Sequence, residues 1–388
     1  MKRDLTPTRR RFVRASQSKP SRLRFLWLLY AVALILSVSS LVTSQTDAKK
    51  DDKKKKPEPF KIQQLTQGMG LYAIGAISPD RQSILLLANK PNESPNLYVM
   101  KLVDHSIRPP LTNFKLGITD AQWSPDGSSV AFAAFSESVS FPEIYTLELK
   151  TGKVLRLTSN SFSDKEPIYA QDGKRLLFTS DESPLPDAAF GTLHIASVAV
   201  TGGKPEAVTE DDCSSIRPGL SSDGKSVLLV KVDEHTGRHS LWQYGFDGKP
   251  QRDLTERKFA RIHSYVNVAG GSLVFWAQEE PDQQEGIYIM KGAEVRPLPD
   301  ADLPKRTPAV SPDGKLIAFI SPTDTGTQLF VFDSASGEIK QITYKPGNAH
   351  SPVFASNSEI LFGSDRERGN EIFSVDLTKA ATDEKKKK

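Results

Sequence analysis

The chain has 388 residues, of which 38% are hydrophobic, and this is enough for a large buried core. The single cysteine, Cys213, excludes an internal disulfide and fits neither a zinc-binding nor a redox spacing. The positive overall charge comes from the ends, because residues 57–382 hold 32 Lys and Arg against 41 Asp and Glu, a net charge of −9. A folded body of this charge argues against nucleic-acid binding.

The first part of the chain is typical of an export signal. Residues 1–24 are basic, and residues 25–43 follow as 19 uncharged, mostly apolar residues. As a helix they would be about 28 Å long, enough to cross the hydrocarbon layer, with the basic flank left in the cytoplasm. A signal peptide cleaved after Ser44 and a retained signal anchor both fit this pattern. The general and the twin-arginine export routes also both fit, the latter through "TRRRFVR" at residues 8–14.

Lysine-rich segments flank the central part of the chain. Residues 44–59 combine lysine with proline and show no apolar periodicity, so we expect a disordered linker. Residues 379–388 end in four lysines, and we expect a disordered tail. The folded domain is therefore expected at residues 60–378.

A tight turn followed by a short apolar strand recurs along this domain. The pattern is clearest in "WSPDGSSVAFAA" (residues 123–134) and "VSPDGKLIAFIS" (residues 310–321). Pro fixes its own φ, Asp can hydrogen-bond the backbone and Gly accepts a positive φ, so the chain reverses in few residues. The aligned acidic turn positions, 43–51 residues apart, are Asp80, Asp126, Asp172, Asp223, Ala269, Asp313 and Ser356.

Two further signals repeat in phase with the turn. One is an aliphatic residue followed by an aromatic one, such as Ile144-Tyr145, and the other is a hydrophobic residue followed by Thr, such as Leu157-Thr158. Each unit therefore predicts four short strands, and this number at this period is the signature of β-propeller blades. The predicted fold is all-β, a seven-bladed β-propeller. Six blades are the alternative, because the fifth and seventh units have lost the acidic turn residue.

The two ends of the domain are expected to meet. The last unit supplies only three strands, whereas "FKIQQLT" (residues 60–66) is an isolated strand with the Leu-Thr ending of a fourth. We expect this amino-terminal strand to complete the last blade and close the ring, because an open ring would expose strand edges.

The "SPDG…IAF…LY…G…LT" phrasing resembles the PD40 (WD40-like) repeats of the TolB family, periplasmic propeller proteins of bacteria, over residues 60–378. The resemblance implies the fold and, by analogy, an envelope protein that binds a partner at the mouth of its channel. Two features depart from TolB, which carries an α/β domain ahead of a propeller with six blades. Here the repeats follow the linker directly, and there are seven units.

Similar repeats occur in two kinds of enzyme. The prolyl-oligopeptidase-like peptidases add a hydrolase domain with a G-x-S-x-G nucleophile motif, and this sequence contains no such motif. Oligogalacturonate lyase is itself a propeller that uses channel residues and a metal. The resemblance to the lyase keeps an enzyme as the alternative.

A candidate site follows from the repeat alignment. The residue six positions before each turn begins the inner strand of a blade and should face the channel mouth; these residues are Ile74, Asp120, Glu166, Arg217, His263, Thr307 and His350. Polar groups that converge in this way are candidates for ligand binding, although loops beside a wet channel are often charged for solvation alone. With Arg306 one position earlier, the candidate partner-binding residues are Asp120, Glu166, Arg217, His263, Arg306 and His350.

No His, Asp or Glu cluster has a convincing metal-ligand spacing, so the sequence assigns no metal, no cofactor and no catalytic residue. We expect Trp123 and His194 to pack in the core. His235 and His239 fall in turn-like segments, and we expect them to be solvated.

The sequence thus predicts a non-catalytic propeller, periplasmic or otherwise extracytoplasmic, that binds a protein or peptide partner of the cell envelope. It would contact the membrane through residues 25–43 if that helix is uncleaved. The alternative is a propeller enzyme of lyase or hydrolase type, with its active site in the central channel.

Overall fold

The computed structural model describes residues 59–68, 70–90, 92–136, 141–182, 192–210, 213–256, 259–268 and 272–380. The predicted basic segment 1–24, the helix 25–43 and nearly all of the linker 44–59 lie outside these residues, as do residues 381–388 of the tail. Within the described ranges, no helix is both long and apolar enough to span a membrane.

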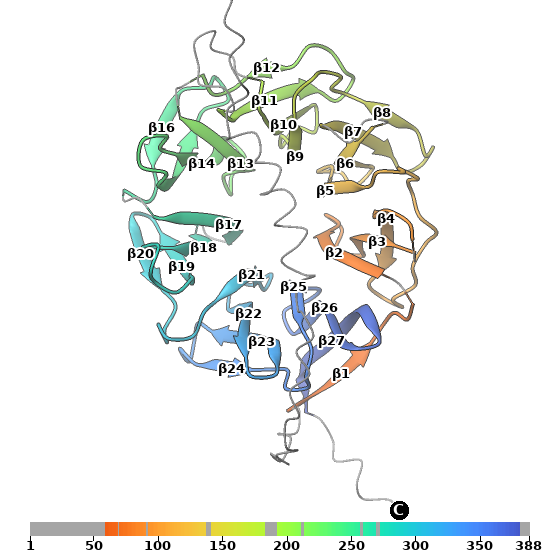
Figure 1. The fold of residues 1–388 in the computed structure, drawn as a ribbon, viewed down its shortest axis with the longest axis vertical. Helices are drawn as coiled ribbons and strands as arrows, with labels where there is room; N and C mark the ends of the chain where they lie inside the picture. The colour runs from red at the N-terminus through yellow and green to blue at the C-terminus, as the bar shows by residue number, and fades with distance from the viewer. Residues whose placement is uncertain are drawn as a thin grey trace, which may run out of the picture. The chain divides into compact units, whose positions relative to one another are not determined.

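Seven antiparallel β-sheets, the blades of a propeller, surround a central axis (Figure 1). The strands nearest the axis are β2 (Gly70–Ile77), β5 (Ile118–Trp123), β9 (Asp164–Tyr169), β13 (Ser214–Leu220), β17 (Arg261–Val268), β21 (Arg306–Val310) and β25 (Ala349–Phe354). The next strands outward are β3 (Ser83–Asn89), β4 (Asn96–Lys101), β6 (Ser129–Phe135), β7 (Pro142–Glu148), β10 (Arg175–Ser180), β11 (His194–Ala199), β14 (Val227–Val232), β15 (His239–Tyr244), β18 (Ser272–Gln278), β19 (Gly286–Lys291), β22 (Leu316–Thr323), β23 (Gly326–Asp333), β26 (Glu359–Glu367) and β27 (Gly369–Ala380). The outermost are β8 (Val154–Arg156), β12 (Glu206–Ala207), β16 (Pro250–Asp253), β20 (Glu294–Pro297), β24 (Ile339–Gln341) and β1 (Phe60–Gln64).

The number of blades agrees with the repeat count. Five blades contain four strands that are consecutive in sequence, and the first blade contains three, β2 to β4. The predicted seven-bladed, all-β propeller is confirmed, and the six-bladed alternative is wrong. The degenerate fifth and seventh units keep the strands of a full blade, because strand pairing depends on the apolar runs and not on the acidic turn residue.

The seventh sheet joins the two ends of the described chain. Its strand order is β1-β27-β26-β25, and β1 pairs antiparallel with β27, with Gln64 opposite Phe373. Just beyond this pairing, the backbone N–H of Leu65 donates to the carbonyl of Ile372 at 2.8 Å. The fourth strand of this sheet therefore comes from the opposite end of the domain.

Hydrogen bonds of a threonine hydroxyl explain the hydrophobic-Thr signal in the sequence. We call the bond from this hydroxyl to the backbone of the neighbouring strand the threonine clasp. In blade 2 the Oγ1 of Thr158 accepts the backbone N–H of Ile144 at 2.9 Å and donates to the buried carboxylate of Glu143 at 2.6 Å. The same bond between hydroxyl and backbone joins Thr112 to Leu97, Thr209 to Ile195, Thr255 to Leu241, Thr343 to Leu329 and Thr66 to Ile372. Each threonine thus ties the end of an outer strand to the strand beside it. Blade 5 has Pro299 at this position, and proline has no hydroxyl.

The Ser-Pro-Asp-Gly turn is closed by its own side chains. The hydroxyl of Ser124 donates to the carboxylate of Asp126 at 2.6 Å and accepts the N–H of Ser129 at 2.9 Å. Gly127 has a φ of 71°, which residues with a Cβ rarely adopt. The serine and the aspartate bond in the same way in Ser78–Asp80, Ser221–Asp223 and Ser311–Asp313. The residues of the turn therefore determine its conformation by themselves, which is why nearly the same short sequence can recur in several blades.

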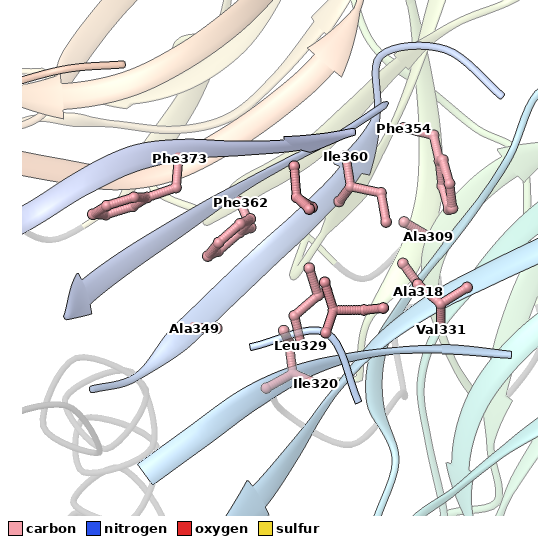
Figure 2. Packing of buried hydrophobic residues seen from close by; sticks show 12 residues of the cluster. Ala309, Ala318, Ile320, Leu329, Val331, Ala349, Phe354, Ile360, Phe362 and Phe373 are labelled. Atoms are coloured by element: carbon pink, nitrogen blue, oxygen red, sulfur yellow. The ribbon is translucent and has the colours of Figure 1, made fainter. Parts of the chain in front are cut away.

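The core lies between neighbouring blades. Figure 2 shows the cluster between blades 6 and 7, where Ile320 and Leu329 of one blade pack with Ile360 and Phe362 of the other. Since both faces of a blade's middle strands are covered, most residues at the centre of these strands are apolar. Burial of each such side chain stabilises the fold by about 1.5–3 kcal/mol.

Two expectations about the core are confirmed. Trp123 is buried, and its indole N–H donates to the carbonyl of Ala76 in the preceding blade at 2.9 Å. His194 is also buried, and burial lowers its pKa to about 4.

Candidate functional site at the inner strands

The candidate residues lie where β-bulges interrupt the inner strands. In β5, for example, the pairing register shifts between Thr119 and Gln122. One residue at this point in five of the inner strands has a φ between 47° and 57°: Asp120, Glu166, Arg217, Thr307 and Ser351. A positive φ is uncommon for residues other than glycine, and bulges of this kind reorient side chains. In blades 2, 3, 4 and 6 the residue at the bulge is the one that the sequence alignment placed in its ring; that these residues bind a partner stays a prediction.

Hydrogen bonds connect three candidate residues from blade to blade. The carboxylate of Glu166 accepts the backbone N–H of Arg217 at 3.0 Å and the hydroxyl of Thr179 at 2.8 Å. Its other oxygen lies 3.5 Å from Nη1 of Arg217. Asp120 likewise accepts the backbone N–H of Glu166. Both carboxylates therefore satisfy the bulge of the next blade, which is a structural role.

The electrostatics of Asp120 reflect this position. The surrounding protein raises the pKa of its carboxyl above the ordinary value, and the like charge of Glu166 adds to the effect. Hydrogen bonds from Thr119 and from the Glu166 backbone act in the opposite direction. The pKa is raised overall, since desolvation disfavours the charged form more than these bonds favour it.

Tyr265 holds the bulge of blade 4 from the following blade. Its hydroxyl donates to the carbonyl of Arg217 at 2.6 Å and lies 3.0 Å from the carbonyl of Leu228. Gly219 is next to the tyrosine ring, and a Cβ there would overlap it. Arg217 is thus fixed through both its N–H and its carbonyl, while its guanidinium group remains partly exposed.

His350 does not occupy the bulge, and its role in binding a partner stays a prediction. The residue with positive φ in blade 7 is Ser351, because the turn that follows is one residue shorter than in blades 1, 2, 3, 4 and 6. His350 pairs with Gly363, where a Cβ would overlap its ring. Its Nε2 lies 2.7 Å from Oδ1 of Asn370, which in turn donates to the carbonyl of Leu71 in blade 1. His350 therefore supports the junction between blades 7 and 1.

His263 and Arg306 meet at the junction between blades 5 and 6. The Nε2 of His263 is 3.2 Å from Oε1 of Glu285, and the other carboxylate oxygen of Glu285 forms an ion pair with Arg306. The ring of His263 stacks on Trp276, with centroids 4.2 Å apart and 21° between the planes. His263 and Arg306 together lower the pKa of Glu285. We call His263, Trp276, Glu285 and Arg306 the blade 5–6 cluster.

The bulge of blade 5 also differs from the others. The register shifts between Ile262 and Ser264, so His263 itself is the extra residue, and its φ is not positive. After the bulge, β17 pairs regularly with β18 from Ser264 to Val268. This earlier bulge turns His263 toward Trp276 instead of toward the next blade's backbone.

His239 is half-buried, and the expectation that it is solvated is wrong. It lies on β15, and its Nδ1 accepts the backbone N–H of Ile262 at 3.2 Å. Burial lowers its pKa to about 4, and the positive charges of Arg261 and Arg217 contribute, with His263 as a smaller influence. The two arginines therefore contribute positive potential around His239.

A sequence model of the TolB beta propeller domain, PD40, matches residues 58–291. The matched range exceeds half of the 388 residues. The chain belongs to the TolB β-propeller domain family. This match confirms the resemblance of the repeats to PD40.

Two curated relatives illustrate the range of proteins that share these repeats. This chain is 26% identical over 222 residues to the Tol-Pal system protein TolB of Francisella tularensis subsp. tularensis. The match covers 56% of this chain and 48% of that protein. The chain is 28% identical over 214 residues to the uncharacterized peptidase YuxL of Bacillus subtilis, covering 53% of this chain and 29% of the peptidase. The chain therefore spans about half or less of the length of these relatives.

Among solved structures, this chain resembles the oligogalacturonate lyase of Vibrio parahaemolyticus, with a TM-score of 0.63 and 15% sequence identity. The match covers 86% of this chain and 96% of the lyase. An identity this low supports the shared fold and carries no activity from one protein to the other. Among the residues that the structure describes, no group of three or more His, Cys, Asp or Glu side chains is placed to hold a metal ion.

Sequence reasoning missed Trp276 and Glu285, which complete the blade 5–6 cluster. A signal for Trp276 was present in the repeat. Trp276 lies opposite Ile287 in the pairing of β18 with β19. The residues at the same place in the other blades are Leu87, Ala133, Thr179, Val230, Ile320 and Gly363. A large aromatic residue in a column of smaller ones marks a blade that differs from the others. Glu285 lies in a loop outside the repeat signals and carries no such mark.

A buried aspartate in blade 3 should give stability an unusual pH dependence. Burial raises the pKa of Asp164 to about 6, although Ser180 and Asn160 donate hydrogen bonds to its carboxylate. Because the folded-state pKa exceeds the ordinary 3.8, the folded protein binds this proton more tightly than the unfolded chain. The free energy of unfolding should therefore fall as the pH rises from about 4 to 6, by about 3 kcal/mol from this group.

Urea unfolding of wild type and Asp164→Asn at pH 4.5 and pH 7 tests this expectation. The difference between the two proteins should shift in favour of the asparagine variant at pH 7. Asp126→Asn is a contrasting control, because hydrogen bonds from Ser124 and Ser128 lower the pKa of Asp126 and reverse the sign of its pH dependence. A difference that is the same at both pH values would show that Asp164 titrates alike in both states.

Proposed function

We propose that this propeller is a non-catalytic, extracytoplasmic protein that binds a protein or peptide partner of the cell envelope at the blade 5–6 cluster. One observation supports the location. The carboxylates of Asp120 and Glu166 are engaged by the backbone of neighbouring blades, whereas the carboxylate of Glu285 in the cluster pairs with the side chains of His263 and Arg306. The side chain of Arg306 is 46% exposed there. Charged and aromatic side chains that are already ordered are typical of recognition surfaces.

The cellular location is part of the proposal. Support comes from the apolar segment 25–43 with its basic flank, which is typical of export, and from the similarity to a Tol-Pal system protein. We propose that the propeller works outside the cytoplasm. If segment 25–43 is retained as an anchor, it would hold the propeller at the inner membrane.

Site-specific photo-crosslinking in cells tests the proposed binding surface. A benzophenone amino acid in place of Gln284, an exposed residue next to Glu285, should form one dominant adduct with an envelope protein after irradiation, because Arg306 is kept. The matched control is the same substitution at Arg296, an exposed arginine that pairs with Glu294 on the outer strand β20. The proposal fails if position 284 gives no adduct, or if positions 284 and 296 give the same adducts.

An enzyme is the second candidate, and one observation favours it. Asp120 has a raised pKa and carries its carboxyl next to Glu166, an arrangement of the kind that enzymes use for general acid catalysis. This candidate predicts turnover of an added substrate that Asp120→Asn abolishes without loss of the fold. The binding proposal predicts that Asp120→Asn leaves the cross-link at position 284 unchanged.

A further inference from the structure

The blade 5–6 cluster and the neighbouring Thr307 contain hydrogen-bond donors that lack an acceptor. Among the described residues, the indole N–H of Trp276 and the hydroxyl of Thr307 make no hydrogen bond. Thr307 lies on β21, which packs against β17 and β18, the strands that carry His263 and Trp276. Buried donors without a partner are rare in folded proteins, and a ligand oxygen beside the stacked rings would give them one.

A third donor of this kind lies on blade 4. The Nε of Arg217 has no partner within the described part of the chain, although Nη1 of the same guanidinium is 3.5 Å from Glu166. Tyr265, two residues from His263 on β17, donates a hydrogen bond to the carbonyl of Arg217, so Arg217 and His263 lie at neighbouring inner strands. The unpartnered donors of blades 4, 5 and 6 therefore belong to one sector of the ring.

Basic side chains are concentrated in this sector. Arg217 lies 3.5 Å from Glu166, and Arg306 forms an ion pair with Glu285. Burial is the main cause of the lowered pKa of His239, and the charges of Arg261 and Arg217 add to it. An anionic group would be attracted here, and the flat guanidinium groups can bind a carboxylate through paired N–H donors.

We propose that blades 4–6 form a carboxylate-binding subsite for an acidic peptide segment. Arg217 and Arg306 would bind the carboxylate, the N–H of Trp276 and the hydroxyl of Thr307 would donate to ligand oxygens, and the His263–Trp276 stack would support an adjacent apolar part. This inference rests on the proposed function, and adds the chemistry of the partner. The carboxylate is either a Glu or Asp side chain or the carboxyl terminus of the partner.

Fluorescence anisotropy with the purified full-length protein and three labelled ten-residue peptides tests the subsite. All three share a Gly-Ser-Phe background. The first carries four Glu and an amidated end, the second no acidic residue and a free carboxyl terminus, and the third four Lys and an amidated end. We expect the first or the second to bind and the third not to bind. Binding of the first assigns acidic side chains, and binding of the second alone assigns a terminal carboxylate.

Two variants connect the binding to the named donors. Arg306→Gln should weaken the acidic peptide about tenfold, whereas Arg296→Gln on the outer strand should leave its affinity unchanged. Trp276→Phe keeps an aromatic ring beside His263 but removes the N–H, and it should also weaken binding. Thermal unfolding confirms that each variant is folded. A variant that unfolds is replaced in the comparison by the other one.

Three results would overturn the subsite: binding of the lysine peptide as tight as that of the acidic one, no binding of either carboxylate peptide, or unchanged binding by both variants. The proposed function is judged separately by the cross-link at position 284, which keeps Arg306. If the cross-link forms while the peptides fail, the partner binds at this surface through other chemistry. If the cross-link is also absent, both proposals are wrong.

Discussion

A chain that begins at residue 70 is expected to lose about 5 kcal/mol or more of unfolding free energy relative to a chain that begins at residue 59. The shorter chain lacks β1 and Thr66, so β27 becomes an edge strand. It also loses the hydrogen bonds from Thr66 to Glu371 at 2.5 Å and from Ile372 to Thr66 at 2.9 Å. The partly buried side chains of β1 leave the core between blades 6 and 7.

Urea unfolding followed by tryptophan fluorescence measures this loss. Thr66→Val, in the chain that begins at residue 59, separates the clasp from the strand and should cost about 1–3 kcal/mol. Thr158→Val makes the same change in a blade built from consecutive strands and is the matched control. If the two truncated chains unfold at the same urea concentration, β1 contributes nothing to the seventh blade, and closure through this strand is excluded.

Replacement of Glu143 by alanine is expected to destabilise the protein by about 3 kcal/mol or more. Glu143 is only 1% exposed, and its carboxylate accepts hydrogen bonds from the hydroxyl of Thr158, the backbone N–H of Asn160 and the guanidinium of Arg156. Alanine would leave the first two donors buried without this acceptor. Such donors lose their partner and gain no water in return.

Glu143→Gln should cost much less, about 1 kcal/mol. The other blades supply the reason, since Gln328 accepts the clasp hydroxyl of Thr343 at 2.6 Å and Asn96 accepts that of Thr112 at 3.0 Å. An amide oxygen therefore does the same job as a carboxylate. Chemical denaturation of both variants decides the point, and equal losses would show that the charge, not the acceptor, stabilises the clasp.

Much of the fold could be predicted because its turns and clasps are formed by residues that lie close together in the sequence. The turn at Asp126 is specified by residues 124–129 alone, and the clasp signal at Thr158 lies in the residues that form it. Counting these signals gave seven blades even where Ala269 or Ser356 had replaced the acid. In blade 7 the alignment selected His350 although the bulge lies at Ser351. The alignment counts back from the turn, and this turn is shorter by one residue, so the position it selects is displaced by one.

The candidate site could be predicted only in part. Counting back from the turn located the bulges at Asp120, Glu166, Arg217 and Thr307, because the length of the inner strand is nearly constant. It could not reveal which side chains are already engaged. Glu166 hydrogen-bonds a residue 51 positions along the chain, and that distance is set by the packing of whole blades.

The sequence by itself determined the repeat, the number of blades and the negative charge of the body, since these depend on neighbouring residues or on composition. Only the tertiary structure separated the carboxylates that bond the backbone of a neighbouring blade from the carboxylate that pairs with side chains. It placed Glu285 between His263 and Arg306, and it turned Trp276 against the histidine. The physical reason is that hydrogen bonding and desolvation act through space, between strands that chain order keeps about one blade apart.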